Sequence, residues 1–220
     1  MSAEEIRIYL ITQMKYLSTL LFFLIAFNLT PLKNASAQNF EGVIIYEIPE
    51  LKDKIGTSRL EYMIKGNKIR IEYDSGNSRT TSILYETTEK TMFISIGMLG
   101  GHVEVPPDDV ELNFRDYDPG FVQTGNSKQI EERVCEVWKA EIEDSRFRYC
   151  FQPETADFIL PINSVTAESV PQWAGVNLPD NYLPLEVTKV ADDGSEEIMM
   201  RAHSVEEKTL NRRLFSVFDN

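Results

Sequence analysis

The chain has little of the chemistry on which enzymes and metal proteins depend. Among its 220 residues are two cysteines and two histidines, His102 and His203. The sequence contains no G-x-S-x-G, H-E-x-x-H, P-loop or G-x-G-x-x-G motif. A zinc site would need more Cys or His ligands, because neither histidine has ligand spacing with the cysteines. We therefore predict that the protein is not an enzyme and has no metal site and no cofactor.

A few features are similar to catalytic or metal-binding patterns but favour a simpler interpretation. His102 follows two glycines, which indicates a loop residue rather than a general base. An EF-hand loop that starts at Asp116 would need Glu at position 127, where the chain has Ser127. Neighbouring carboxylates in polar stretches are typical of solvated surface; they are Asp108 and Asp109, Asp192 and Asp193, and Glu206 and Glu207.

Positive charge is also scarce. Lys and Arg together number 22 against 35 Asp and Glu, so the formal net charge is −13. Such a surface repels phosphate backbones and anionic lipid head groups. The composition therefore argues against nucleic acid as a partner and against electrostatic adhesion to a membrane.

Long hydrophobic runs are absent except near the N-terminus. Lys15 is followed by an apolar run from Leu17 to Leu29 and then by the small residues Ala35-Ser36-Ala37. This order is typical of a secretory signal peptide. The run is about a dozen residues long, shorter than the ~20 that a membrane-spanning helix needs.

We therefore expect residues 1–37 to be a signal peptide, with Met14 as an alternative start because acidic residues precede it. An uncleaved run that serves as an N-terminal anchor is the alternative. Residues 38–220 would form one domain in the periplasm or outside the cell, with no transmembrane segment after cleavage.

The two cysteines, Cys135 and Cys150, lie in the stretch VCEVWKAEIEDSRFRYCF. In an exported protein such a pair favours a disulfide, with two free buried thiols as the alternative. The flanking patterns predict two strands joined by a turn at Glu143-Asp144-Ser145. A connection of two or four residues would place both cysteines on one face of the hairpin, within disulfide reach. Closing this loop should stabilise the fold by roughly 3 kcal/mol.

Alternating apolar residues predict further antiparallel strands. EGVIIYEI, RTTSILYE and TMFISI read as strands, and RLEYMIKGNKIRIEYD reads as a hairpin around Gly66-Asn67. LEVTKV and EIMMRAHSV flank a turn at Asp193-Gly194. Glycine and proline between Gly97 and Gly120 indicate a long excursion. Short helical turns are expected around Ala156 to Val165 and Val170 to Gly175, and the tail reads as a strand or a short helix.

Several of these motifs occur in a recognisable order: FEGVIIYEI, YMIKGNKIRIEY, EKTMFIS, TGNSKQI and CEVW. This order resembles a group of uncharacterised bacterial envelope proteins allied to the LolA/LolB-like lipoprotein carriers. The likeness covers Phe40 to about Phe151. The chain departs from the group before its first cysteine, where I-x-G-Y-x-C is common and this sequence has Ile130-Glu131-Glu132-Arg133-Val134-Cys135.

The resemblance implies a mainly β fold of the α+β kind: a strongly curved antiparallel sheet that forms an open half-barrel, closed by short helices. In the named carriers the concave face receives acyl chains. The alternating strands of this chain supply candidates for that face; they are Tyr46, Ile48, Tyr62, Ile64, Ile71, Tyr73, Met92, Ile94 and Trp138.

Two functions follow as hypotheses. The first is a non-enzymatic carrier module that binds a lipid or an acylated peptide on the concave face, with Gly97 to Gly101 as a movable rim. The second is a structural or protein-interaction domain of the cell envelope, whose sheet is filled by its own helices and whose acidic outer surface meets a protein partner. Apolar alternation is needed for both, so it does not decide between an ordinary core and a ligand cavity.

Overall fold

The computed structural model describes residues 40–74, 80–96, 102–105, 110–112, 118–153, 155–159, 161–163 and 171–216. The chain divides into two units, Met1–Ala37 and Gln38–Asn220. The predicted signal peptide and the proposed rim at 97–101 lie outside the described residues, so both stay predictions. Within the described ranges, no helix is long and apolar enough to cross a membrane.

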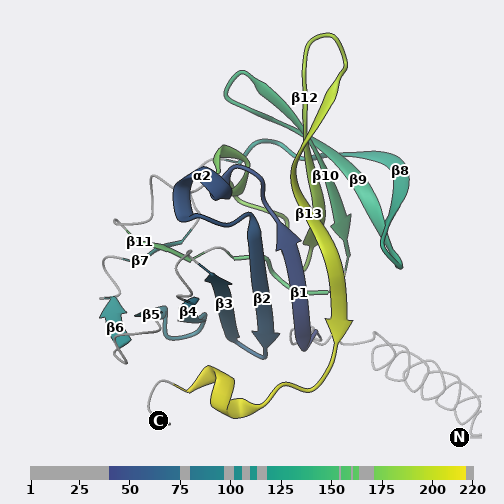
Figure 1. Cartoon of the computed structure of the whole chain (residues 1–220). Helices are drawn as coiled ribbons and strands as arrows, with labels where there is room; N and C mark the ends of the chain where they lie inside the picture. Colours follow the sequence, from purple (N-terminus) through teal and green to yellow (C-terminus); the bar gives the residue numbers. More distant parts are fainter. Residues whose placement is uncertain are drawn as a thin grey trace, which may run out of the picture. The chain divides into compact units, whose positions relative to one another are not determined.

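Eleven strands of the second unit form one antiparallel sheet in the order β6-β5-β4-β3-β2-β1-β13-β12-β10-β9-β8 (Figure 1). The edge strands β6 and β8 do not pair with each other, so the sheet is open. The predicted mainly β, antiparallel fold is confirmed. The strands are β1 (Gly42–Glu47), β2 (Arg59–Lys65), β3 (Lys68–Asp74), β4 (Thr80–Glu86), β5 (Thr91–Ile96), β6 (His102–Val105), β8 (Val122–Ile130), β9 (Arg133–Ile142), β10 (Ser145–Gln152), β12 (Leu183–Val190) and β13 (Glu196–Glu207).

Two short strands, β7 (Val110–Leu112) and β11 (Pro161–Asn163), form a separate antiparallel pair. Helical structure in the described ranges comprises α2 (Leu51–Ile55), η4 (Gln172–Ala174) and η5 (Arg212–Phe215). The helix α2 was not predicted, and η4 lies in one of the two predicted helical turns. Residues 156–159, in the other predicted turn, are not helical.

Local turn chemistry explains the hairpins. Lys65 pairs with Lys68 across Gly66-Asn67, and Gly66 has φ of +58°, a conformation that glycine adopts without steric cost. The pairing of β1 with β13 is different, because it joins strands from opposite ends of the unit. This contact connects the run β1 to β6 with the run β8 to β13.

Alternation along the strands gives the sheet two unlike faces. We call the face that packs into the main core the inner face; it carries Ile44, Tyr46, Tyr62, Tyr149 and Val187, all buried. The opposite, outer face has a smaller apolar cluster. That cluster comprises Val43, Ile45, Met63, Leu84, Leu210 and Phe215, with Phe93 packed against it.

The C-terminal segment covers this outer cluster. Glu41 Oε1 accepts a hydrogen bond from the Leu210 N–H at 2.6 Å and also binds Lys65 Nζ. Arg70 Nη1 donates to the Leu214 carbonyl at 2.7 Å. The sequence predicted either a strand or a short helix for this tail, and the structure has a short 3-10 segment there. Polar contacts hold the tail to Glu41, which precedes β1, and to β3.

Candidate functional site

The structure brings the predicted concave-face residues together in the main core. Tyr46, Ile48, Tyr62, Ile64, Ile71 and Met92 are buried members of that core, and Tyr73, Ile94 and Trp138 are partly buried against it. They therefore lie together, and the chain's own side chains are among their neighbours. Whether a ligand also contacts them stays a prediction.

The segment 155–159 lies against the inner face. The Phe158 ring stacks on Tyr62 at 5.2 Å between centroids and meets Tyr46 edge-on at 5.6 Å. The Tyr62 hydroxyl donates to the Ile159 carbonyl at 2.8 Å and accepts from the Ile159 N–H at 3.0 Å. One tyrosine thus satisfies both backbone groups of a loop residue, which fixes this segment on β1 and β2.

The segment 171–182 is held in a similar way, because the Tyr149 hydroxyl donates to the Trp173 carbonyl at 2.8 Å. The Tyr46 hydroxyl donates to the Pro184 carbonyl, at the start of β12, at 3.0 Å. Burial raises the pKa of Tyr46, Tyr62 and Tyr149 well above the usual range of a phenol. These hydroxyls keep their protons near neutral pH and act as structural donors.

Among the buried side-chain groups that find no hydrogen-bond partner in the part of the chain that the structure describes are the Tyr85 hydroxyl on β4 and the Trp173 indole N–H. Both residues are almost fully buried in the main core. Each therefore loses hydration without the compensating hydrogen bond that the other inner-face tyrosines have.

Cys135 and Cys150 form a disulfide with Cα atoms 5.3 Å apart, which confirms the predicted pair. Ile142 pairs with Ser145, so the connection between β9 and β10 has two residues. The register places Cys150 opposite Val137, so the cysteines are diagonal neighbours rather than directly opposed. The right-handed twist of paired strands brings one diagonal closer, which accounts for the short distance.

A buried carboxylate lies next to the disulfide. Glu186 pairs with Cys150 in the register of β10 and β12 and is 3% exposed. Lys128 Nζ binds Glu186 Oε1, and Arg201 Nε lies 3.0 Å from Glu186 Oε2 without a well-aimed hydrogen bond. Two cations therefore compensate one buried acid, and this arrangement connects β8, β12 and β13.

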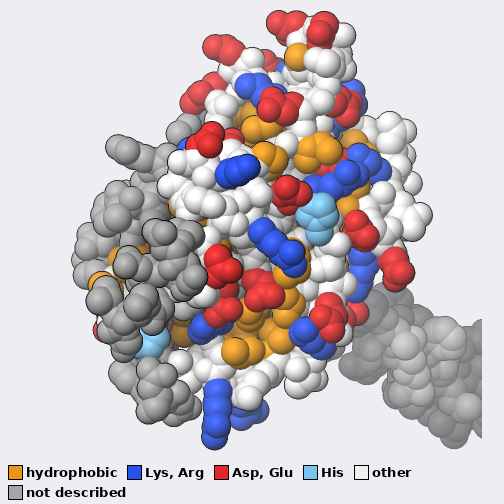
Figure 2. Space-filling model, in the orientation of Figure 1, with side chains coloured by type: hydrophobic (Ala, Val, Ile, Leu, Met, Phe, Trp, Pro, Cys, Tyr) orange, Lys and Arg blue, Asp and Glu red, His pale blue; other side chains and the backbone are white. Residues whose placement is uncertain are grey.

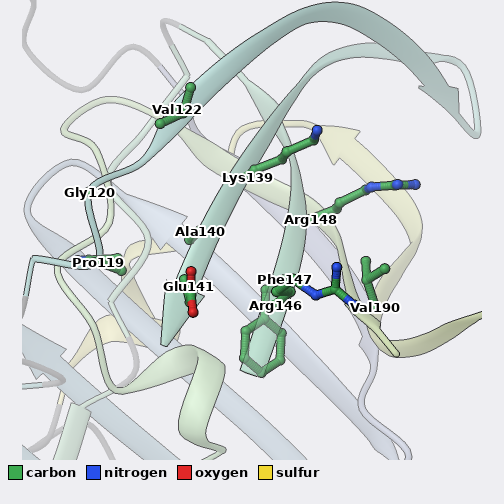
Figure 3. Close-up of a pocket in the computed structure, with 10 residues that line it drawn as sticks. All are labelled: Pro119, Gly120, Val122, Lys139, Ala140, Glu141, Arg146, Phe147, Arg148 and Val190. Atoms are coloured by element: carbon green, nitrogen blue, oxygen red, sulfur yellow. The ribbon is translucent and has the colours of Figure 1, made fainter. Parts of the chain in front are cut away.

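A cavity of about 490 Å³ lies where β8, β9, β10 and β12 run side by side (Figure 3). Arg146 and Arg148 alternate with the buried residues Phe147 and Tyr149, so they point to the outer face. Figure 3 shows Lys139, Arg146 and Arg148 extending toward the same side. The lining comprises Pro119, Gly120, Val122, Lys139, Ala140, Glu141, Arg146, Phe147, Arg148 and Val190.

Pairing between strands explains why these residues meet. Lys139 pairs with Arg148 on one side and with Val122 on the other, while Arg146 pairs with Glu141 and Val190. The sequence pattern alone does not reveal this site. The alternation of arginines in RFRYC was visible, but its place beside Val122 and Val190 depends on which strands are neighbours.

The cations of this cavity differ in how firmly they are held. Arg146 Nη2 donates to the Ala191 carbonyl at 2.8 Å and lies 3.0 Å from Asp192 Oδ1. Arg148 pairs with Glu196. Lys139 has no ion-pair partner among the described residues. Charged groups of both signs mix over the face of the molecule shown in Figure 2.

Comparison with known proteins adds little. No protein-family model matches the chain, and no curated protein matches it. Among solved structures, the chain is similar to PNGF-II with a TM-score of 0.38 and 11% identity, over 84% of this chain and 31% of that one. The chain thus spans less than a third of the length of PNGF-II, and so weak a likeness carries no argument about fold or activity.

Proposed function

We propose that this chain is an exported, non-enzymatic binding module for a lipid or an acylated peptide that carries an anionic group. The observation that supports this most is the cavity of Figure 3, where three cations stand beside apolar side chains in a chain of net charge −13. The disulfide agrees with an oxidising compartment such as the periplasm. As part of the same proposal, the open sheet is a half-barrel related to the LolA-like carriers, with its concave side closed by short helices.

We place the ligand in this outer cavity rather than on the inner face. The inner face is covered by segments that the hydroxyls of Tyr62 and Tyr149 and the Phe158 ring hold in place. A ligand there would have to displace these contacts and leave buried backbone groups without partners. Binding in the outer cavity would cost much less free energy, because the ion pairs that a ligand would replace there are solvent-exposed and each contributes about 1 kcal/mol or less.

Binding would use both kinds of lining. The anionic group would lie between Lys139 and Arg148, where it would replace the exposed Glu196 as a partner. The acyl chain would cover Val122, which is 63% exposed, and Val190. Apolar area removed from water contributes about 25 cal/mol per Å². The acyl chain of the ligand would therefore supply most of the affinity, and the cations would orient the ligand.

The test is calorimetric titration of the whole protein with dodecanoate. The Lys139→Ala variant should bind about tenfold more weakly, because a hydrogen bond to a charged group contributes about 1.5 kcal/mol. Lys52→Ala, in the exposed helix α2, is the matched control and should bind as the parent does. Equal weakening in both variants, or no binding to the parent, would contradict the proposal.

Extraction provides an independent check. The protein is purified gently from its own envelope, extracted with organic solvent, and the extract is weighed by mass spectrometry. We expect a lipid or an acylated molecule above the level found with an unrelated exported protein. An extract at that background level would count against a resident ligand.

The filled inner face favours a second candidate function, a structural or interaction domain that meets an envelope protein. The supporting observation is the continuous main core, which includes six of the nine residues that were predicted to line a ligand and has the other three packed against it. Crosslinking in the envelope should then recover one defined protein partner. A defined partner together with no binding of dodecanoate would favour this candidate over the first.

A further inference from the structure

A second cavity, also of about 490 Å³, lies on the outer face where β1, the start of β2 and β13 meet. It shares no lining residue with the cavity of Figure 3. Ile45, a member of the outer apolar cluster, supplies an apolar wall. The remaining lining residues are polar or charged; they are Glu47, Ser58, Arg59, His203 and Ser204.

An irregularity in β13 places the imidazole. Ile45 pairs with Ser204 and Tyr46 pairs with Ala202, so His203 is an extra residue with no partner on β1. Such bulges redirect a side chain out of the regular alternation. His203 Nε2 lies 2.5 Å from Glu47 Oε2. The bulge therefore brings the imidazole to Glu47 at the wall of the cavity.

Arg59 is the unusual member of this group. It pairs with Glu47 in the register of β1 and β2, yet no described acid lies within ion-pair distance of its guanidinium. The other strand arginines in the described ranges do have acidic partners; these arginines are Arg70, Arg133, Arg146, Arg148 and Arg201. In a chain with 35 acidic and 22 basic residues, an arginine left without an acid is unexpected.

The Glu47 carboxylate is already in contact with His203. Arg201, the register partner of Glu47 on β13, forms its ion pair with Glu186 instead. Arg59, with its planar set of N–H donors, lines this hollow together with two serines, and it also lines a separate cavity with Glu61, Glu72 and Asp74. A planar guanidinium can donate two parallel hydrogen bonds to the two oxygens of a carboxylate, which a lysine ammonium cannot do with the same geometry.

We propose that this cavity binds the carboxylate of a small organic acid. Arg59 is the main cation, Ser58 and Ser204 supply hydroxyl donors, and Ile45 contacts the apolar part of the acid. Glu47 remains on the wall and repels a second negative charge, so a singly charged carboxylate is preferred over inorganic phosphate. The site is independent of the cavity of Figure 3, and neither proposal needs the other.

The two histidines make the test specific, because each supplies one set of imidazole NMR signals. The whole ¹⁵N-labelled protein is titrated with sodium acetate, and separately with sodium phosphate, at constant pH and ionic strength. We expect a saturable shift of the His203 signals with acetate and a weaker response to phosphate. His102, which lies on β6 and lines neither cavity, should not respond.

Variants decide the role of Arg59. Arg59→Ala and Arg59→Gln should each weaken the acetate response at least tenfold. Arg213→Ala, which removes the same charge from η5, should leave it unchanged. A response of His203 that survives both Arg59 variants, or parallel linear shifts of both histidines, would mean an adventitious ion only and overturn the proposal. Tighter binding of phosphate than of acetate would overturn the choice of carboxylate.

Discussion

The two faces of the sheet use polar side chains in opposite ways. On the inner face, the hydroxyls of Tyr62 and Tyr149 bind backbone groups of covering segments, the hydroxyl of Tyr46 binds a backbone group of β12, and all three residues are buried. On the outer face, arginines and acids form exposed pairs around open cavities. Polar groups that fix the fold cannot be exchanged cheaply, whereas exposed ion pairs can. This difference is why both ligand proposals concern the outer face.

The largest expected effect comes from emptying the inner face. Phe158→Ala removes the ring that contacts both Tyr46 and Tyr62, and should lower the free energy of unfolding by about 3–5 kcal/mol. Val122→Ala, at an exposed position of β8, should change it by less than about 0.5 kcal/mol. Urea denaturation of the two variants measures the contrast. Similar losses in both would mean that the two faces do not differ as described.

The disulfide should contribute next. It closes a loop with a sequence separation of 15 residues, and the chain-entropy model gives about 3 kcal/mol for such a loop. The Cys135→Ser/Cys150→Ser double variant should lose about 3 kcal/mol of unfolding free energy and therefore melt at a lower temperature than the parent. Thiol titration of the denatured, unreduced parent should find no free thiol. Two reactive thiols, or equal melting of variant and parent, would contradict this.

A matched pair of tyrosine variants sharpens the comparison within the inner face. Tyr62→Phe leaves both backbone groups of Ile159 without their partner and should cost about 1–3 kcal/mol. Tyr85→Phe removes a buried hydroxyl that has no hydrogen-bond partner among the described residues, so it should be neutral or slightly stabilising. Chemical denaturation of both variants gives the sign of each change. A larger loss at Tyr85 than at Tyr62 would contradict the hydrogen-bond assignment.

The smallest expected effect on stability concerns Glu41, an acid on the outer face that binds Lys65 and the C-terminal segment. The Lys65 ammonium, and next the Leu210 N–H, keep the pKa of Glu41 below its ordinary value of 4.5. The folded state thus binds this proton less readily than the unfolded state, so the contribution is present above pH 4.5 and is lost as pH falls through the folded pKa. The difference in stability between the parent and Glu41→Gln should therefore shrink in acid. A difference that stays constant between pH 7 and pH 3 would exclude this linkage.

The sequence predicted well those features that depend on neighbouring residues. The turn at Gly66-Asn67 and the cysteine hairpin both follow from local patterns, and both are present. The edge strand β8 has few apolar residues and no buried alternating face, so its pattern did not reveal it. The five-residue helix α2 is too short to show a helical period.

The candidate sites were harder to predict for a related reason. Alternation placed the nine predicted concave-face residues on one side of the sheet. The same alternation is expected for an ordinary core and for a ligand pocket, so it does not distinguish them. Both outer cavities need contacts between strands far apart in sequence. The bulge at His203, which builds the second cavity, depends on the pairing of β13 with β1 and has no sequence signal of its own.

That pairing also bears on how the protein reaches its native state. The runs β1 to β6 and β8 to β13 can form largely from neighbours in sequence, but β1 meets β13 only when Gly42 and Glu207 come together. Contacts between such distant segments form late, because the entropy of closing a long loop must be paid first. Until then the free edge of β1 can pair with another chain. We therefore expect newly synthesised chains to depend most on protection from aggregation in the interval before β13 arrives.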